Sequence, residues 1–170
     1  MIIRDAIEAD FEAVTAIYNE VLRNSTAIYR DEPVEIAERV SLWKSRFAQG
    51  YPTLVACDAK SAVCEGDPVA GYASFGDFRT GAGYRFTVEH TVHVHSDWRG
   101  RGVGAALMGA LIPRAAALGK HVMVGGIDAE NTGSLTFHER LGFERVAHFR
   151  EVGFKFGRYL DLILVQRTIG

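Results

Sequence analysis

Cysteine is scarce in this chain, which has two such residues, Cys57 and Cys64, among 170. They do not form a Cys-x-x-Cys motif, so the sequence does not indicate a disulfide framework. We expect two free thiols in a reducing cytoplasm. A chain of this length can bury a sizeable core without cross-links, and we expect one domain spanning residues 1–170.

A large net charge and a long apolar run are also missing. The formal net charge is −2, whereas a general nucleic-acid-binding protein normally has a clear basic excess. The longest apolar stretch, residues 103–113, ends at Arg114 and is too short to span a bilayer. Acidic residues crowd the first twelve positions, so no signal peptide is readable there. We therefore expect a cytoplasmic protein that binds neither nucleic acid nor a membrane.

Segments typical of strands and of helices alternate along the chain, without repeats or low-complexity linkers. Apolar residues at helical spacing indicate helices, and β-branched runs between turn residues indicate strands. We predict helices at 9–23, 34–48, 102–118 and 132–141, and strands at 1–4, 53–57, 69–75, 84–95, 121–125, 144–149 and 159–168. Pro33 is expected to open the second helix, and a polar turn around residues 65–67 to separate two strands. This order predicts a mixed α/β sheet and not a series of simple βα repeats.

Glycine and arginine are concentrated at the predicted start of the third helix, where Gly100, Gly102 and Gly104 alternate with Arg99 and Arg101. A helix N-terminus offers unpaired N–H groups and a positive dipole end, and glycine lets an anion approach them closely. Arginine adds charge and directional donors. The segment is therefore interpreted as a diphosphate-binding turn, the alternative being a glycine-rich turn with two solvated arginines.

A dinucleotide-binding turn is a second interpretation of the same residues. Gly100-x-Gly102-x-x-Ala105 follows a predicted strand and opens a helix, and Asp128 lies near the offset of a ribose-binding carboxylate. Against this, residues 95–99 separate the motif from its strand, and too little chain follows it for further βαβ units. We rank this interpretation second.

The same residues carry a resemblance to a known family. Arg99-Gly100-Arg101-Gly102-Val103-Gly104 is similar to the (Gln/Arg)-x-x-Gly-x-(Gly/Ala) signature of the GNAT superfamily of N-acetyltransferases. A second block agrees, because Asn131 and the run of residues 137–143, Phe-His-Glu-Arg-Leu-Gly-Phe, resemble the family's second motif. Within the superfamily, residues 84–92 and 25–29 resemble the phosphinothricin and methionine sulfoximine acetyltransferase group.

The resemblance implies a fold, a cosubstrate and a set of residues that bind it. The fold would be a mixed, mostly antiparallel central sheet of about seven strands flanked by about four helices. The cosubstrate would be acetyl-CoA, with its pyrophosphate on the glycine turn and its pantetheine along the strand before that turn. The implied cofactor-binding residues are Val92, His93, Val94, Arg99, Gly100, Arg101, Gly102, Val103, Gly104, Ala105 and Asn131. Asn131 can also cap its helix.

Glu89 is the candidate catalytic base. Acetylation requires a neutral amine, and a carboxylate can remove the ammonium proton directly or through one water. Glu89 lies mid-strand among apolar and β-branched residues, where partial burial raises a carboxyl pKa. The alternative is an ion pair with Arg85 four residues earlier, which we consider strained because the two would be about 13 Å apart along a strand.

His138 is the candidate proton donor to the departing thiolate of coenzyme A. Many family members have tyrosine at this position, whereas the phosphinothricin group carries histidine. An imidazole titrates near neutral pH and can donate a proton. The alternative is that His138 only packs on its own helix over Ser134 and Leu141.

The acyl acceptor is expected to bind near a glycine-rich loop. Arg79 and Arg85 flank this loop and could hold the anionic groups of a small glutamate-like amino acid, and Phe78 and Tyr29 are candidate pocket walls. Ordinary loop arginines are the alternative. The resemblance also implies a homodimer with the acceptor site near its interface.

We predict an acetyl-CoA-dependent N-acetyltransferase that acetylates phosphinothricin, methionine sulfoximine, methionine sulfone or a similar small amino acid in a ternary complex. Alternatives are acetylation of a protein N-terminus or another amine, and a non-catalytic acyl-CoA-binding module. A metal site on His90, His93 and His95, with Glu89 or Asp97, is a weaker hypothesis, and we expect no metal.

Overall fold

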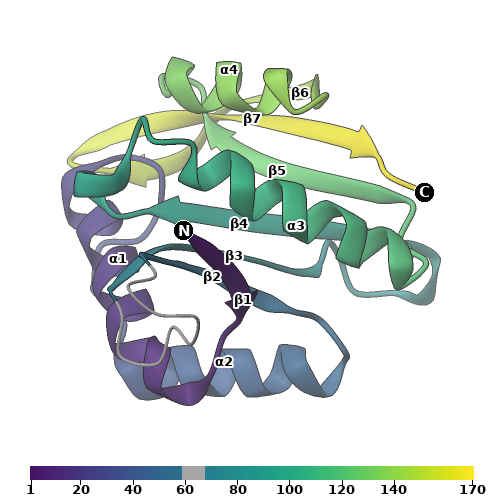
Figure 1. The fold of residues 1–170 in the computed structure, drawn as a ribbon. Helices are drawn as coiled ribbons and strands as arrows, with labels where there is room; N and C mark the ends of the chain where they lie inside the picture. Colours follow the sequence, from purple (N-terminus) through teal and green to yellow (C-terminus); the bar gives the residue numbers. More distant parts are fainter. Residues whose placement is uncertain (59–67) are drawn as a thin grey trace.

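The computed structural model describes residues 1–58 and 68–170, in which seven strands and four α-helices alternate (Figure 1). The strands are β1 (Ile2–Asp5), β2 (Thr53–Cys57), β3 (Val69–Asp77), β4 (Thr87–Val94), β5 (Val122–Asp128), β6 (Glu144–Lys155) and β7 (Arg158–Thr168). The helices are α1 (Phe11–Asn24), α2 (Ile36–Ala48), α3 (Val103–Ala117) and α4 (Thr132–Arg140), with 3₁₀ turns η1 (Glu8–Asp10), η2 (Ala82–Tyr84) and η3 (Ser96–Trp98). The predicted turn at 65–67 and Cys64 lie outside the described residues.

All seven strands of the described chain join one sheet in the order β1-β2-β3-β4-β5-β7-β6. Neighbouring strands are antiparallel except β4 and β5, which run parallel. The expected mixed, mostly antiparallel sheet is therefore confirmed. Its single parallel pair lies at the centre, where α3 connects one strand to the next.

The helices cover both faces of the sheet. On one face, α3 and α4 bury Leu107, Leu111 and Leu135 against Val88 and Met123 of the sheet. On the other face, α1 and α2 pack Phe11, Ile17 and Trp43 against Val55 and Tyr72. Figure 1 shows α3 along one side of the strands and α1 with α2 on the other. Residues of β4 alternate between these two cores, as strand geometry requires.

The predicted starts of the second helix and of the fourth strand are wrong. Helix α2 begins at Ile36 and not beside Pro33, because the amide of Asn19 binds both the N–H and the C=O of Val34 and holds that segment outside the helix. The strand predicted at 84–95 begins only at Thr87, since Ala82–Tyr84 forms η2 and Arg85 has helical backbone angles.

Strand β6 is longer than predicted and leads into β7 through a tight hairpin. Phe156 and Gly157 have φ of 51° and 73°, values that suit a two-residue hairpin turn. Phenylalanine is atypical at such a position, so the residue pattern did not indicate the turn. Among the described helices, none has both the length and the apolar character that a membrane crossing needs.

Candidate active site

A fork between β4 and β5 defines the centre of the candidate site. The two strands pair only over Thr87–Glu89 and Val122–Val124, and β4 then continues to Val94 and β5 to Asp128 without pairing to each other in the described chain. Figure 1 shows the two strands diverging toward their C-terminal ends. On its other edge, β4 remains paired with β3 through Val94. After Glu89, the edge of β4 that faces β5 is therefore paired with no strand of the described chain.

The predicted glycine turn lies at the outer end of this fork and begins α3. Gly100 and Gly102 have φ of 73° and 80°, a left-handed conformation that glycine adopts without strain, and no heavy atom lies within 4 Å of a Cβ built at either. Gly102 is the N-cap and supplies no side-chain hydrogen bond to α3. The first N–H groups of α3 therefore face an open turn, which fits the diphosphate of acetyl-CoA.

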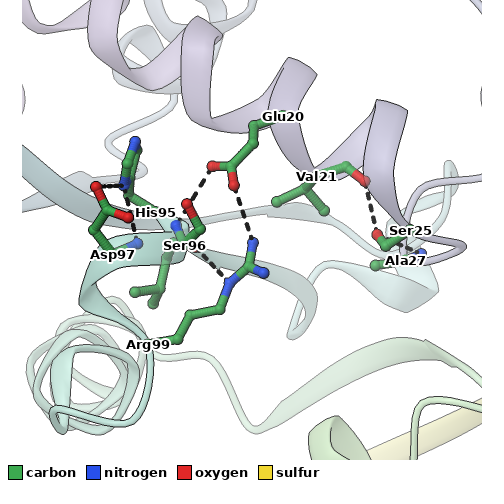
Figure 2. A network of polar contacts seen from close by, with 9 residues as sticks. Glu20, Val21, Ser25, Ala27, His95, Ser96, Asp97 and Arg99 are labelled. Carbon is green, nitrogen blue, oxygen red and sulfur yellow. Dashed lines mark hydrogen bonds and ion pairs between the residues drawn. The ribbon is translucent and has the colours of Figure 1, made fainter.

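The two arginines of the turn have different surroundings. Arg99 Nε donates to the carbonyl of Val94 at 3.1 Å, and its guanidinium lies 3.8 Å from Glu20 of α1 (Figure 2). Arg99 therefore ties the end of β4 to α1. Arg101 is exposed and stacks over Trp98, 5.2 Å from the ring centroid. Both arginines are exposed, but for Arg101 the contact described is with an aromatic ring and not with a carboxylate.

Glu89 lies at the last paired position of β4, where the fork opens. Glu89 as a whole residue is exposed, and its side chain is directed toward the α1/α2 face, with Oε1 3.4 Å from a Cβ position at Gly126 of β5. Partial desolvation of the carboxyl group raises the Glu89 pKa, while the nearby Arg46 guanidinium of α2 lowers it, and the net direction is upward. This is the direction a general base needs. The alternative pairing with Arg85 does not form, since Arg85 donates to the carbonyl of Ala82.

His138 lies on the opposite face of the sheet, inside the α3/α4 core. It is 4% exposed, and burial lowers its pKa. Its Nδ1 lies 2.7 Å from the Ser134 carbonyl oxygen, and its Nε2 lies 2.9 Å from Nε2 of His90. To donate to a thiolate, His138 must therefore release one of these partners. Asn131 accepts a hydrogen bond from the N–H of Ser134 and so caps α4, which is the helix-capping role expected for it.

The remaining cofactor candidates on β4 are divided between its faces. Val92 and Val94 pack against the α3/α4 core, whereas His93 lies between Tyr18 and Tyr72 on the α1/α2 face. Burial lowers the pKa of His93 to about 4.

His95 lies beyond the strand, where its Nδ1 accepts from Asp97 N–H. Within residues 1–58 and 68–170, no group of three or more His, Cys, Asp or Glu side chains is arranged to hold a metal ion.

The four acceptor candidates form two separate sets. Phe78, Arg79 and Arg85 lie at the end where β4 begins, and each arginine stacks on an aromatic ring of its own loop. Tyr29 lies near the other end of β5, where its phenol donates to the carbonyl of Asp161. No contact described for this chain joins the two sets, so their common role stays a prediction.

Several residues near the site were not predicted. Arg46 donates to Ser74 and lies against Gly76, the cross-strand partner of Glu89. Lys155 of β6 is 1% exposed and donates to the carbonyl of Leu22 in the last turn of α1 and to those of Ser25 and Ile28 in the segment that carries Tyr29. Strand alternation around Lys155 is the one sequence signal that could have indicated its inward direction.

Asp128 also differs from its place in the dinucleotide interpretation. It is 2% exposed and accepts hydrogen bonds from the hydroxyl of Thr26 and from the N–H of Glu130. A carboxylate buried in this way has no surface to present to a ribose. It instead joins the end of β5 to the segment after α1.

Comparisons with known proteins agree with this geometry. Residues 14–143 match the acetyltransferase (GNAT) family. The chain is 49% identical to the L-methionine sulfoximine/L-methionine sulfone acetyltransferase of Pseudomonas aeruginosa, over 98% of this chain and 94% of that protein. It is 34% identical to the phosphinothricin N-acetyltransferase of Streptomyces coelicolor, over 98% of this chain and 95% of that protein. An acetyltransferase structure from Salmonella typhimurium, solved with its cofactor acetyl-CoA, has a TM-score of 0.93 and 43% identity, over 100% of this chain and 94% of that one.

The chain therefore belongs to the acetyltransferase (GNAT) family. The expected family, fold, N-acetyltransferase activity and acetyl-CoA cosubstrate are confirmed. The dinucleotide interpretation is wrong, because the chain belongs to an acetyltransferase family and Asp128, its expected ribose ligand, is buried. The binding of the acetyl-CoA diphosphate at the glycine turn stays a prediction. The roles of individual residues stay predictions.

Proposed function

We propose that this enzyme acetylates the amine of a small amino acid by direct transfer from acetyl-CoA in a ternary complex. The observation that carries the proposal is the fork between β4 and β5, with Glu89 at its base and the open α3 turn at its outer end. The amine and the acyl donor can thus meet at one carboxylate. No nucleophilic side chain is needed, so no acyl-enzyme is proposed.

The chain's own residues supply three functions. Glu89 removes a proton from the acceptor ammonium, directly or through one water. The fork-facing edge of β4, over Val92–Val94, holds the pantetheine and polarises the acyl carbonyl through a main-chain N–H. His138 supplies a proton to the departing thiolate. Acetyl-CoA itself supplies the acetyl group as a thioester.

The proposed acceptors are methionine sulfoximine, methionine sulfone and phosphinothricin. Support comes from the relatives that are named for these compounds and from the exposed Arg79 and Arg85, which suit anionic groups. A peptide N-terminus is the competing acceptor, because the same base and fork would serve any amine.

The test is thiol release from acetyl-CoA by the purified enzyme with each of these amino acids, free proteinogenic amino acids and short peptides. We expect kcat/KM to be highest for the sulfoximine, sulfone and phosphinothricin. Higher kcat/KM values with peptides would identify a peptide N-terminus as the acceptor instead. Equal thiol release with and without every acceptor would reject transfer to a small amine.

A homodimer in the cytoplasm is part of the proposal. Strand β6 is the edge of the sheet, and apolar side chains on it and its hairpin are exposed, namely Val146, Phe149, Val152, Phe154, Phe156 and Tyr159. The scarcity of cysteine agrees with a reducing compartment. Analytical ultracentrifugation should give a mass of two chains, and a single-chain mass at micromolar concentration would reject the dimer.

A further inference from the structure

His90 occupies the point at which β4 and β5 separate. It follows Glu89, the last residue of β4 that pairs with β5, and its side chain enters the α3/α4 core. Its Nδ1 lies 2.8 Å from the carbonyl oxygen of Val124, the last residue of β5 that pairs with β4. The imidazole thus makes a bond to β5 where the main-chain ladder ends. Gly125 leaves room for it, because a Cβ at that position would lie 2.5 Å from His90 Cε1.

The same ring reaches His138 on α4. The two Nε2 atoms are 2.9 Å apart, and Nδ1 of His138 lies 2.7 Å from the Ser134 carbonyl oxygen. A continuous chain of contacts therefore runs from β5 through both imidazoles to α4. Both rings are buried and also pack against Phe143.

Counting protons shows that the two rings depend on each other. The carbonyls of Val124 and Ser134 can only accept, so each Nδ1 must carry a proton to bond its carbonyl. A hydrogen bond between the two Nε2 atoms needs a third proton. Two neutral imidazoles carry only two ring protons, so the two rings cannot make all three hydrogen bonds unless one of them is charged. Burial opposes the extra charge and lowers the pKa of both rings. The proton that one ring holds therefore decides what the other can donate.

We propose that His90 is a positioning residue for the acetyl-transfer reaction, which fixes the orientation and tautomer of His138 through the Nε2–Nε2 contact. This inference rests on the proposed function, in which His138 supplies a proton to the thiolate. His90 itself touches no reacting atom. Its second contact, to Val124, holds the fork in register, and substitutions at His90 can keep one contact and remove the other.

Two substitutions separate the contacts. In His90→Asn the amide nitrogen takes the place of Nδ1 and keeps the bond to Val124, whereas in His90→Gln the terminal amide takes the place of Nε2 and keeps a partner for His138. We expect His90→Asn to lower kcat about tenfold, which is the loss expected for one hydrogen bond. The kcat of His90→Gln should stay within about threefold of the wild-type value. The KM for acetyl-CoA should change less than about twofold in both. Equal kcat values for the two variants, or a lower value for Gln, would overturn the proposal.

A double-mutant cycle with His138→Asn adds a readout that a merely structural role would not move. We expect His90→Asn to cause no further loss of kcat in the His138→Asn background, and an undiminished loss there would overturn the coupling. His121→Asn is the matched control, because His121 is an exposed imidazole at the other end of β5, and kcat should not change.

Nitrogen NMR of the His138 ring separates this inference from the proposed function, since it needs no turnover. We expect the His138 ring-nitrogen shifts to be retained in His90→Gln and changed in His90→Asn. Unchanged shifts in both would overturn the positioning role, even where His138→Asn loses activity. Wild-type kcat in His138→Asn would reject the donor role of His138 alone. Should His90→Asn not fold, the Gln variant decides, because loss of the wild-type shifts there contradicts the proposal.

Discussion

Glu89 and His90 are neighbours in β4, but their side chains lie on opposite faces of the sheet and in different surroundings. On the α1/α2 face, Glu89 is exposed and lies near the Arg46 guanidinium. On the α3/α4 face, His90 and His138 are buried among apolar residues, and burial lowers their pKa values. One strand thus separates an exposed acidic residue from two buried imidazoles that contact each other. The fork between β4 and β5 is where these two environments meet.

Removing the carboxylate on the open face should have the largest effect. We expect Glu89→Gln to lower kcat at least about a hundredfold, the usual contribution of a general base. Binding of acetyl-CoA, measured by calorimetry, should persist. Glu12→Gln is the matched control, because Glu12 is an exposed carboxylate of α1 away from the fork. Retained turnover in Glu89→Gln would show that solvent suffices as the base.

A methyl group in the cofactor turn should have the next largest effect. Gly102→Ala places a side chain at a left-handed position of the open turn, and we expect the KM for acetyl-CoA to rise about tenfold. Gly119→Ala is the matched control, because Gly119 follows α3 with a φ of 73° and has an equally open surrounding.

Both glycine variants should lower the free energy of unfolding by about 1–2 kcal/mol, which thermal melting can compare. Only Gly102→Ala should change the KM. An equal rise of the KM for acetyl-CoA in both variants would show that general destabilisation causes the rise, and not a change in the turn before α3.

Loosening the segment after α1 should have a smaller effect on catalysis. Lys155→Met leaves two carbonyls of that segment, and that of Leu22 in the last turn of α1, without their ammonium donor. We expect a loss of about 2–3 kcal/mol in the free energy of unfolding. The KM for the acceptor should rise about fivefold, because Tyr29 is misplaced. Lys44→Met removes only a surface pair with Glu8 and should change neither quantity measurably. An unchanged acceptor KM in Lys155→Met would remove this segment from the acceptor site.

The smallest expected effect is a shift of the pH profile. Glu89 must be ionised to act as a base, so kcat/KM should increase as pH rises through the Glu89 pKa. Arg46 lowers this pKa, and Arg46→Met should therefore move the acid limb of the profile to higher pH. Arg39→Met, on the same helix, should leave the limb in place. A limb that moves to lower pH in Arg46→Met would contradict the proposed base.

Local features of the site were predictable from neighbouring residues. The glycine turn follows from residues that tolerate a positive φ directly before a helix, and Asn131 precedes a helix that it caps. Glu89 was identifiable as a charged residue inside an apolar strand. These features depend on backbone conformation over a few residues, which the local sequence encodes.

Contacts between distant segments were not predictable. His90 and His138 are 48 positions apart, and Lys155 lies 127–133 positions from the carbonyls that it binds. The proximity of Arg46 to Glu89 depends on how α2 crosses β3, for which a single sequence carries no signal. The separation of Phe78 from Tyr29 has the same origin.

The sequence by itself determined the order of strands and helices, the open turn before α3 and the presence of an acid in β4. Only the tertiary structure decided where β4 leaves β5, and which side chains share the space at that fork. The physical reason is that backbone preference acts between neighbours, whereas burial, pKa and proton sharing depend on groups that packing brings together from distant positions.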